Sequence, residues 1–329
     1  MGQLPVEAWL DQLAWVAMPA RVPTVVDPAV LRLLTAWWMP LAAFVWGTLW
    51  GSFANVVIWR VPRGQSVVRP GSRCGACGQP IRWFDNLPVI SYLMLRGRCR
   101  ACDAPISLRY MVVELAAGML SFALYRAMVV VPLLEGGGIE GVAAWQLWFV
   151  FCLALIVVTY TDLDLWVIPD AVVLPVAALG LVVAAVEPEL AGVSWREAAG
   201  AAATGYAIVA TIRWVYLRWR GIEAMGLGDG KLLLMIGAFC GFPGLLWALG
   251  AGATQSLLIA VPMLMFGRGV ANSDLQAVHG DDPLLGEEDP DAGIAGKRIP
   301  FGPFLALAAL EFVLLRPQLE RLFEWFVQG

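Results

Sequence analysis

The sequence predicts an all-α polytopic membrane protein of about eight transmembrane helices with a small zinc-binding cytoplasmic loop domain. Hydrophobic residues make up 60% of the 329 residues and charged residues only 15%, whereas soluble domains average about 25% charged residues. Several mostly apolar runs reach about 18 residues or more, which is enough to cross a bilayer core. Two C-x2-C pairs lie in a polar loop between the first two runs.

The chain begins with an extension and one span. The spacing of Trp and Leu in residues 1–35 suits an amphipathic segment that lies at the membrane interface. The alternative is that these residues form a poorly ordered extension. The apolar run 36–59 is the first transmembrane helix. Residues 60–110 form the polar loop that carries the cysteine pairs.

The remaining spans form a transmembrane core, 111–267, and a last helix with its tail, 300–329. Between them lies an acidic insert, 268–299, whose composition predicts a solvated loop. Inside the core, two helices are joined either by the "GFPG" turn that begins at Gly241 or by a short link near Gly250. The eight expected spans are 36–59, 111–132, 144–161, 170–187, 198–217, 230–248, 248–267 and 301–315.

The placement of Lys and Arg predicts the orientation, because short cytoplasmic loops carry an excess of both. Nine arginines lie between Arg60 and Arg109, whereas the segments 133–143 and 188–197 on the opposite side carry only Arg196. The loop 60–110 and the insert are therefore expected to face the cytoplasm, with the N-terminus outside.

The four loop cysteines predict a structural zinc site. Two pairs separated by 21 residues match the spacing of a four-thiolate site, and a reducing cytoplasm disfavours the alternative of two disulfides. A closed site of this kind folds a loop and leaves no open position for chemistry. Nucleic-acid binding is not expected, because topology accounts for the loop arginines. The predicted ligands are Cys74, Cys77, Cys99 and Cys102.

The stretch "GLGDGK", 226–231, raises the question of catalysis. A phosphate-binding loop needs a glycine where Met225 stands and a Ser or Thr where Leu232 stands, so that reading fails. The alternative is that Asp229 works together with Asp162 of "TYTDLDLWVIPD", since both carboxylates fall at cytoplasmic helix ends. Two carboxylates that share one proton can activate water and polarise a peptide carbonyl, as in aspartic proteases.

These motifs resemble those of the bacterial type IV prepilin peptidases. "GSFANVVIWRVPRG" is similar to the first-span motif of that family, and "SRCGACGQPIRWFDNLPVISYLMLRGRCRACDAPISLRYMVVEL" to its zinc-bearing loop. "TDLDLWVIPD" and "GLGDGKLLLMIGAFCG" resemble its two aspartate motifs, and "IPFGPFLALAAL" its last span. Five motifs in the family's order, from Gly51 to Leu310, make the resemblance specific.

The resemblance implies an eight-span aspartyl protease of the bacterial inner membrane. Such enzymes cut the leader from type IV prepilins and type II secretion pseudopilins after a glycine at the cytoplasmic face, and many methylate the new N-terminus with S-adenosylmethionine. It gives the catalytic roles to Asp162 and Asp229. The surrounding membrane lipid is the other expected partner. Residues in matching motifs that are expected to support activity are Asn55, Arg60, Glu114, Gly228 and Lys231.

Two other functions remain open at the level of the sequence. A broader intramembrane aspartyl protease of the presenilin type also uses a G-x-G-D aspartate. A proton-coupled membrane transporter could use paired aspartates without any cleavage, although such a protein has no evident need for the zinc loop.

Overall fold

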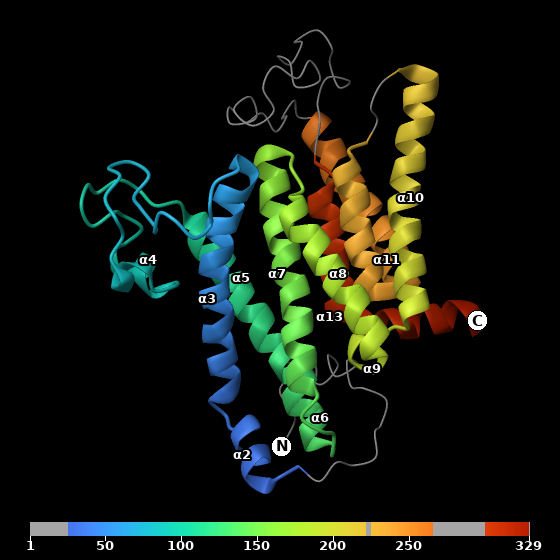
Figure 1. Ribbon diagram of the computed structural model, residues 1–329, viewed down its shortest axis with the longest axis horizontal. Helices are drawn as coiled ribbons and strands as arrows, with labels where there is room; N and C mark the ends of the chain where they lie inside the picture. Colours follow the sequence, from blue (N-terminus) through green and yellow to red (C-terminus); the bar gives the residue numbers. More distant parts are fainter. Residues whose placement is uncertain (1–25, 222–224, 266–299, 329) are drawn as a thin grey trace. The chain divides into compact units, whose positions relative to one another are not determined.

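The computed structural model describes residues 26–221, 225–265 and 300–328, and its regular structure there is helical (Figure 1). Within these ranges the chain forms no strand, only two isolated β-bridges. The chain divides into two compact units, one formed by 1–156 with 320–329 and the other by 157–319. The acidic insert and most of the predicted extension, 1–25, lie outside the described residues.

The first unit contains short helices, one polar loop and three long helices. A Ser107 hydroxyl accepts the backbone N–H of Arg109 and caps the helix that follows the loop, as expected for a serine at an N-cap. The elements are α2 (Pro28–Leu34), α3 (Met39–Arg60), η2 (Val61–Arg63), η3 (Trp83–Asn86), α4 (Ile90–Met94), α5 (Leu108–Tyr125), the π-helical turn η4 (Arg126–Val130), α6 (Val131–Leu134) and the first part of α7 (Gly141–Leu165).

Small residues bring α3 and α5 into close contact. Gly47 and Gly51 stand one helical turn apart on α3. A Cβ added to Gly47 would lie 2.5 Å from the Ala117 carbonyl oxygen, and one added to Gly51 would lie 2.8 Å from Glu114 Cα. Helices in membranes associate through such small residues because lipid provides no hydrophobic drive. The Ser121 hydroxyl also donates to the Ala43 carbonyl at 2.7 Å, so both packing and a polar contact hold this pair.

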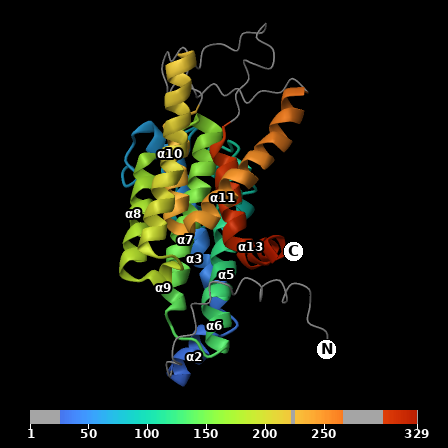
Figure 2. The ribbon, with the colours of Figure 1, turned by 90° about the vertical axis from the view of Figure 1, so that its right-hand side faces the viewer.

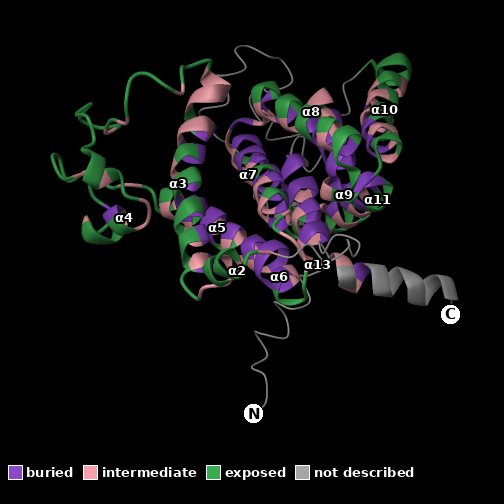
Figure 3. Ribbon diagram, turned by 60° about the horizontal axis from the view of Figure 1, so that its bottom comes forward, coloured by how far each residue is buried: buried purple, intermediate pink, exposed green. Residues whose placement is uncertain are grey.

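Helices α3 and α7 differ in how much of their surface is buried. Figure 3 shows α7 largely buried and α3 largely exposed or intermediate. The exposed residues of α3 are bulky and apolar, which is the composition of a surface that faces lipid rather than water. Among them are Leu41, Val45, Trp46, Trp50 and Trp59.

The second unit is built from the end of α7 and the helices that follow it. The Ser194 hydroxyl accepts the backbone N–H of Glu197 and caps the start of α10. The elements are α8 (Asp170–Val186), α9 (Pro188–Ala191), α10 (Trp195–Arg220), α11 (Leu227–Met265) and α13 (Gly302–Gln328), the last of which continues into the first unit.

α11 reverses direction at Gly241, whose φ of 62° and ψ of −163° interrupt the helix. Before this residue, Gly230 packs against Val209 and Gly237 against Ala201, so the segment runs antiparallel to α10. After it, Gly244 packs against Phe312 and Gly252 against Leu305, so the return segment runs antiparallel to α13. Figure 2 shows these two parts of α11 running in different directions. The link therefore falls at "GFPG", and the helices bounded by 230–248 and 248–267 in the prediction are 227–240 and 242–265.

Four helices of the described chain are long and apolar enough to cross a membrane. α8 is apolar but has only 17 residues. The segment 227–240 is shorter still and extends only about 21 Å at 1.5 Å per residue, against a core of about 30 Å. Helix length and composition therefore support a polytopic membrane protein, whereas the count of eight stays a prediction. The four candidate spans are Met39–Arg63, Leu108–Leu134, Gly141–Leu165 and Leu227–Ile259, the last of which contains the reversal at Gly241.

Candidate active site and metal centre

Asp162 lies in the last turn of α7, with 6% of its surface exposed. Its carbonyl accepts the backbone N–H of Trp166 at 3.0 Å. Trp166 then adopts a φ of 54°, and the chain turns to Pro169 and the start of α8. A buried carboxylate in an apolar helix is costly, so its polar surroundings determine what it can do.

Asp229 lies in the first turn of α11, after the glycines of "GLG". The first turn of a helix has unpaired N–H groups and favours a negative charge. The start of this helix is held against α10, because a Cβ on Gly230 would lie only 3.2 Å from Cβ of Val209. A glycine at that position lets the two backbones approach closely and fixes where Asp229 begins its helix.

The structure brings these two aspartates together although 67 residues separate them in sequence. The charge of Asp229 acts on the Asp162 carboxylate, and both residues belong to the second unit. Two carboxyl groups that share one site favour the state in which they hold a single proton between them. This arrangement supplies one base and one acid to the same substrate.

Gly302, the first residue of α13, is a further part of this site. Its backbone N–H donates a hydrogen bond to the Asp162 carboxylate, and a Cβ at this position would lie 2.5 Å from Asp162 Oδ2. Ile168 fills the space beside it, 3.2 Å from the position of that added Cβ. Ile168 also packs on Gly228, where an added Cβ would lie 3.2 Å away.

Sequence reasoning assigned no role to Gly302 or Ile168. The signal for Gly302 was the run "IPFGPF", in which a glycine opens a helix between two bulky residues, a position where close backbone approach is expected. No comparable signal marks Ile168, which is one apolar residue among many. Gly228, in contrast, was predicted, and it lies against the same isoleucine.

Lys231 lies next to the pair but turns toward a different carboxylate. Its Nζ is 2.7 Å from both carboxylate oxygens of Asp170. Asp170 is the first residue of α8, so this ion pair joins the starts of α8 and α11. Lys231 therefore positions the helix that carries Asp229.

The other three predicted residues lie in the first unit and anchor its loop. Asn55 donates to the Tyr110 carbonyl at 3.1 Å. Arg60 donates to the carbonyls of Ser66 at 3.0 Å and Gly71 at 3.3 Å. Glu114 is buried and accepts the backbone N–H of Val89 at 2.7 Å. All three belong to the first unit, whereas Asp162 and Asp229 belong to the second.

The four loop cysteines form one cluster of free thiols. Their sulfur atoms all lie within 4.8 Å of one another, and those of Cys74 and Cys102 are 3.8 Å apart. A tetrahedral zinc ion with Zn–S bonds of about 2.3 Å needs sulfur atoms about 3.8 Å apart. Backbone N–H groups of Cys77 and Ala76 lower the pKa of the Cys74 thiol to about 6, which favours the thiolate that binds metal. These residues fit a zinc ion.

The two halves of the cluster repeat one another. "RCGACGQPI", 73–81, and "RCRACDAPI", 98–106, share six of nine residues at an offset of 25. Each half closes with the same β-bridge, Arg73 with Pro80 and Arg98 with Pro105. Each also has a left-handed residue directly after its second cysteine, Gly78 in one and Asp103 in the other. The cluster is therefore built from two equivalent knuckles.

A bidentate ion pair ties the second knuckle to the rest of the loop. The Arg100 guanidinium donates to Asp85 of η3 at distances of 2.6–3.0 Å. The same contact keeps the pKa of the Asp85 carboxyl below its usual value.

Comparison with known proteins gives matches along most of the chain. Residues 45–128 match the bacterial peptidase A24 N-terminal domain, and residues 149–267 match the type IV leader peptidase family. A Myxococcus xanthus protein named prepilin leader peptidase/N-methyltransferase is 35% identical, and the alignment covers 84% of this chain and 90% of that protein. Proteins of the same name from Pseudomonas putida and Klebsiella pneumoniae are 34% and 36% identical, covering 86% and 67% of this chain and 93% and 89% of theirs. No solved structure matches.

Proposed function

Because this chain belongs to the type IV leader peptidase family, we propose that it cuts the leader from type IV prepilins and type II secretion pseudopilins after a glycine. Its relatives are both peptidases and methyltransferases by name, and this chain is a peptidase that is also a methyltransferase. The observation that carries the proposed mechanism is the interaction between Asp162 and Asp229. A proton-coupled transporter has no support among these relatives.

Peptide hydrolysis at this site needs one carboxylate and one carboxylic acid. The ionised aspartate takes a proton from water, whose oxygen attacks the carbonyl carbon of the scissile bond. The protonated aspartate gives its proton to the carbonyl oxygen, which produces a tetrahedral intermediate. The carbon–nitrogen bond then breaks as the leaving nitrogen takes up a proton, and no covalent acyl-enzyme forms. The Gly302 N–H holds one of the two carboxylates in place throughout.

We place Asp162, Asp229 and the cysteine loop at the cytoplasmic membrane face. The nine arginines between Arg60 and Arg109 support this orientation. Eight crossings remain the proposed count, because eight apolar runs recur along the sequence. The exposed apolar face of α3 supports contact with lipid.

Methylation would follow cleavage and act on the amine that cleavage releases. S-adenosylmethionine, when bound, supplies the methyl group. Zinc on Cys74, Cys77, Cys99 and Cys102 has a structural part in this scheme, because four thiolates leave no coordination position for a reactant.

The proposal is tested by cleavage of a leader-bearing prepilin with the purified protein in detergent. Asp162→Asn and Asp229→Asn should each lower the cleavage rate by at least about 100-fold, because each removes an acid or base that acts in the transition state. Asp164→Asn is the matched control, two residues away in the same motif, and should leave cleavage near the wild-type rate. Mass spectrometry of the products should place the cut after glycine.

Retention of expression level and zinc content in both Asn variants would show that the loss is chemical rather than structural. Cleavage at wild-type rate in either variant would refute the aspartate pair. A cut at many different residues would instead favour the broader presenilin-type protease.

A further inference from the structure

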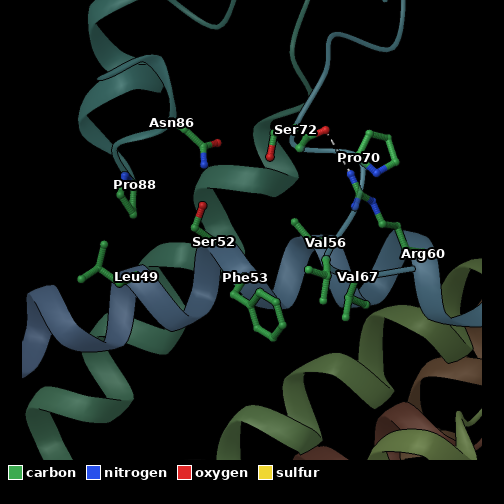
Figure 4. Close-up of a pocket in the computed structure, with 12 residues that line it drawn as sticks. Leu49, Ser52, Phe53, Val56, Arg60, Val67, Pro70, Ser72, Asn86 and Pro88 are labelled. Carbon is green, nitrogen blue, oxygen red and sulfur yellow. Dashed lines mark hydrogen bonds between the residues drawn. The ribbon is translucent and has the colours of Figure 1, made fainter. Parts of the chain in front are cut away.

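The first unit contains a cavity of about 330 Å³ between α3 and the loop that follows it. Ligand pockets in proteins typically begin at about 300 Å³, so the space suits a small molecule. One wall is the end of α3, and the other is formed by the chain before the first knuckle and by the segment between η3 and α4 (Figure 4). All lining residues belong to the same unit.

The helical wall presents one continuous face of α3. Leu49, Ser52, Phe53, Val56 and Arg60 follow the spacing of residues that share a side of a helix. Three of them are apolar, and the polar ones stand at separated positions. Since Ser52 and Arg60 are eight positions apart in the helix, their Cα atoms are about 12 Å apart along the axis. The cavity is thus elongated, with polar groups spaced along an apolar floor.

Arg60 brings a positive charge to one end of this cavity. Two of its N–H groups hold the loop carbonyls of Ser66 and Gly71, and a guanidinium has five donors. The guanidinium is planar, and its remaining N–H donors can bind both oxygens of a carboxylate. Phosphate and carboxylate groups are both ligands of such an arginine, so the rest of the cavity has to identify the occupant.

The other end of the cavity has two neutral polar side chains, Ser52 and Asn86, and the carboxylate of Glu114 lies behind Ser52. The side chains of Ser52 and Asn86 point toward one another from the two walls in Figure 4. The Ser52 hydroxyl also bonds to the buried carboxylate of Glu114. A hydroxyl and an amide suit the hydroxyl groups of a sugar, and a carboxylate behind them favours a nearby cation over an anion.

We propose that this cavity binds S-adenosylmethionine, an inference that rests on the methyltransferase half of the proposed function. The donor carries a carboxylate, a sugar, an apolar base and a positive sulfonium; the lining offers partners for the first three, and Glu114, which lies behind Ser52 and outside the lining, for the fourth. Arg60 would bind the carboxylate, Ser52 and Asn86 the ribose hydroxyls, and Phe53 with its apolar neighbours the adenine. Glu114 would balance the positive charge. A phospholipid headgroup, which carries its anion without a ribose or a base, uses only the Arg60 end.

The metal cluster supports the outer wall of this cavity. Ser72 lines the cavity and its carbonyl accepts the N–H of Ile81, across the first knuckle. Asn86 ends η3, whose Asp85 is held by Arg100 of the second knuckle. Both parts of the loop wall are therefore fixed by the segments that bind the metal, which gives the zinc site a reason to accompany methyl transfer.

The test is equilibrium binding of radiolabelled S-adenosylmethionine to the full-length, zinc-loaded protein in detergent, with and without a prepilin peptide. Val56→Trp fills the cavity without removing any hydrogen bond, and it should weaken binding by about tenfold or more. Val45→Trp is the matched control on the same helix, because Val45 is exposed and does not line the cavity. Arg60→Lys keeps the charge but loses the fork, and should weaken binding by about tenfold.

Several outcomes would overturn the proposal. Equal binding by Val56→Trp and Val45→Trp would place the donor elsewhere, and displacement of the label by phosphatidylglycerol would make the cavity a lipid site. Absence of binding by the wild-type protein, with or without peptide, would reject both the cavity and the methyltransferase half of the proposed function. Prepilin cleavage measured on the same samples reports separately on the peptidase half.

Discussion

At the scale of single residues, Gly302 gives the aspartate pair an asymmetry that neither aspartate has alone. The Gly302 N–H donates to Asp162, and a hydrogen bond to a carboxylate stabilises its charged form. Asp229 has the N-terminal turn of α11 around it instead. The two members of the pair therefore differ in surroundings, and in the proposed mechanism this difference would let one carboxyl group keep the proton while the other serves as base.

Gly302→Ala should reduce prepilin cleavage by about tenfold or more while the protein remains folded. The added Cβ would meet Asp162 Oδ2 at 2.5 Å, so the carboxylate must move, and a small misplacement of a catalytic group can cost about 100-fold in rate. The measurement is kcat for a prepilin peptide. Gly250→Ala is the control, since an added Cβ there meets nothing within 4 Å. Equal rates for the two variants would show that Gly302 has no positioning role.

Residue types predicted part of this site and geometry supplied the rest. Asp162 and Asp229 could be proposed from the sequence because carboxylates at the edge of apolar runs are rare and expensive. The four cysteines were identifiable from spacing alone, and their sulfur atoms lie within 4.8 Å. Gly302 and Ile168 were not assigned, because their role depends on which helix ends lie beside Asp162. The sequence of each helix alone does not show which other helix ends lie beside it in the folded protein.

At the scale of elements, the reversal of α11 explains why its helices were hard to delimit. An apolar run with no polar interruption predicts continuous helix, and here it covers two helices joined at one glycine. Gly241 adopts a φ of 62°, which is favourable for glycine and strained for other residues. The "GFPG" pattern marked this position, whereas the alternative near Gly250 lies inside the return helix.

Gly241→Ala should destabilise the protein by about 1–3 kcal/mol, the cost of holding a non-glycine residue in a strained backbone conformation. An added Cβ would also lie 2.5 Å from Glu197 Oε1. The measurement is thermal unfolding in detergent. Gly250→Ala should be neutral or stabilising by up to about 1 kcal/mol, because alanine favours a helix interior over glycine. A lower unfolding temperature for Gly250→Ala than for Gly241→Ala would contradict this account of the turn.

The Lys231–Asp170 pair acts at the same scale, on the starts of two helices. Reversing either charge should lower prepilin cleavage about twofold to tenfold, because repulsion would disturb the turn that carries Asp229. The double variant Lys231→Asp with Asp170→Lys should recover most of that loss. Asp170 is 54% exposed, so the pair contributes little to global stability, and kinetics rather than unfolding is the measurement. Failure of the double variant to recover would assign Lys231 a role beyond this pair.

For the whole molecule, the two compact units contain the residues of the two proposed activities separately. The family model for the N-terminal domain, 45–128, falls entirely within the first unit, which contains the cysteine cluster and the cavity. Asp162, Asp229 and Gly302 all belong to the second unit. Composition was enough to predict a helical membrane protein. It did not predict this division, because both units have the same apolar character and α7 passes through both.

Removal of zinc should therefore separate the two activities. Treatment with a strong chelator, or Cys74→Ser, should reduce S-adenosylmethionine binding at least about tenfold, since the loop wall of the cavity loses its support. Prepilin cleavage should stay within about twofold of the wild-type rate in the same samples. Parallel assays of binding, cleavage and zinc content provide the measurement, and zinc returned after chelation should restore binding. Loss of cleavage in step with loss of zinc would refute the separation.

The matching halves of the cysteine cluster divide one metal site equally between two short segments. Six of nine residues recur at an offset of 25 with the same bridge and the same left-handed turn. One such segment offers only two thiolates and cannot enclose a tetrahedral ion. Because both segments stand in one polypeptide, a single chain can close the site around its metal, and no second molecule has to supply ligands.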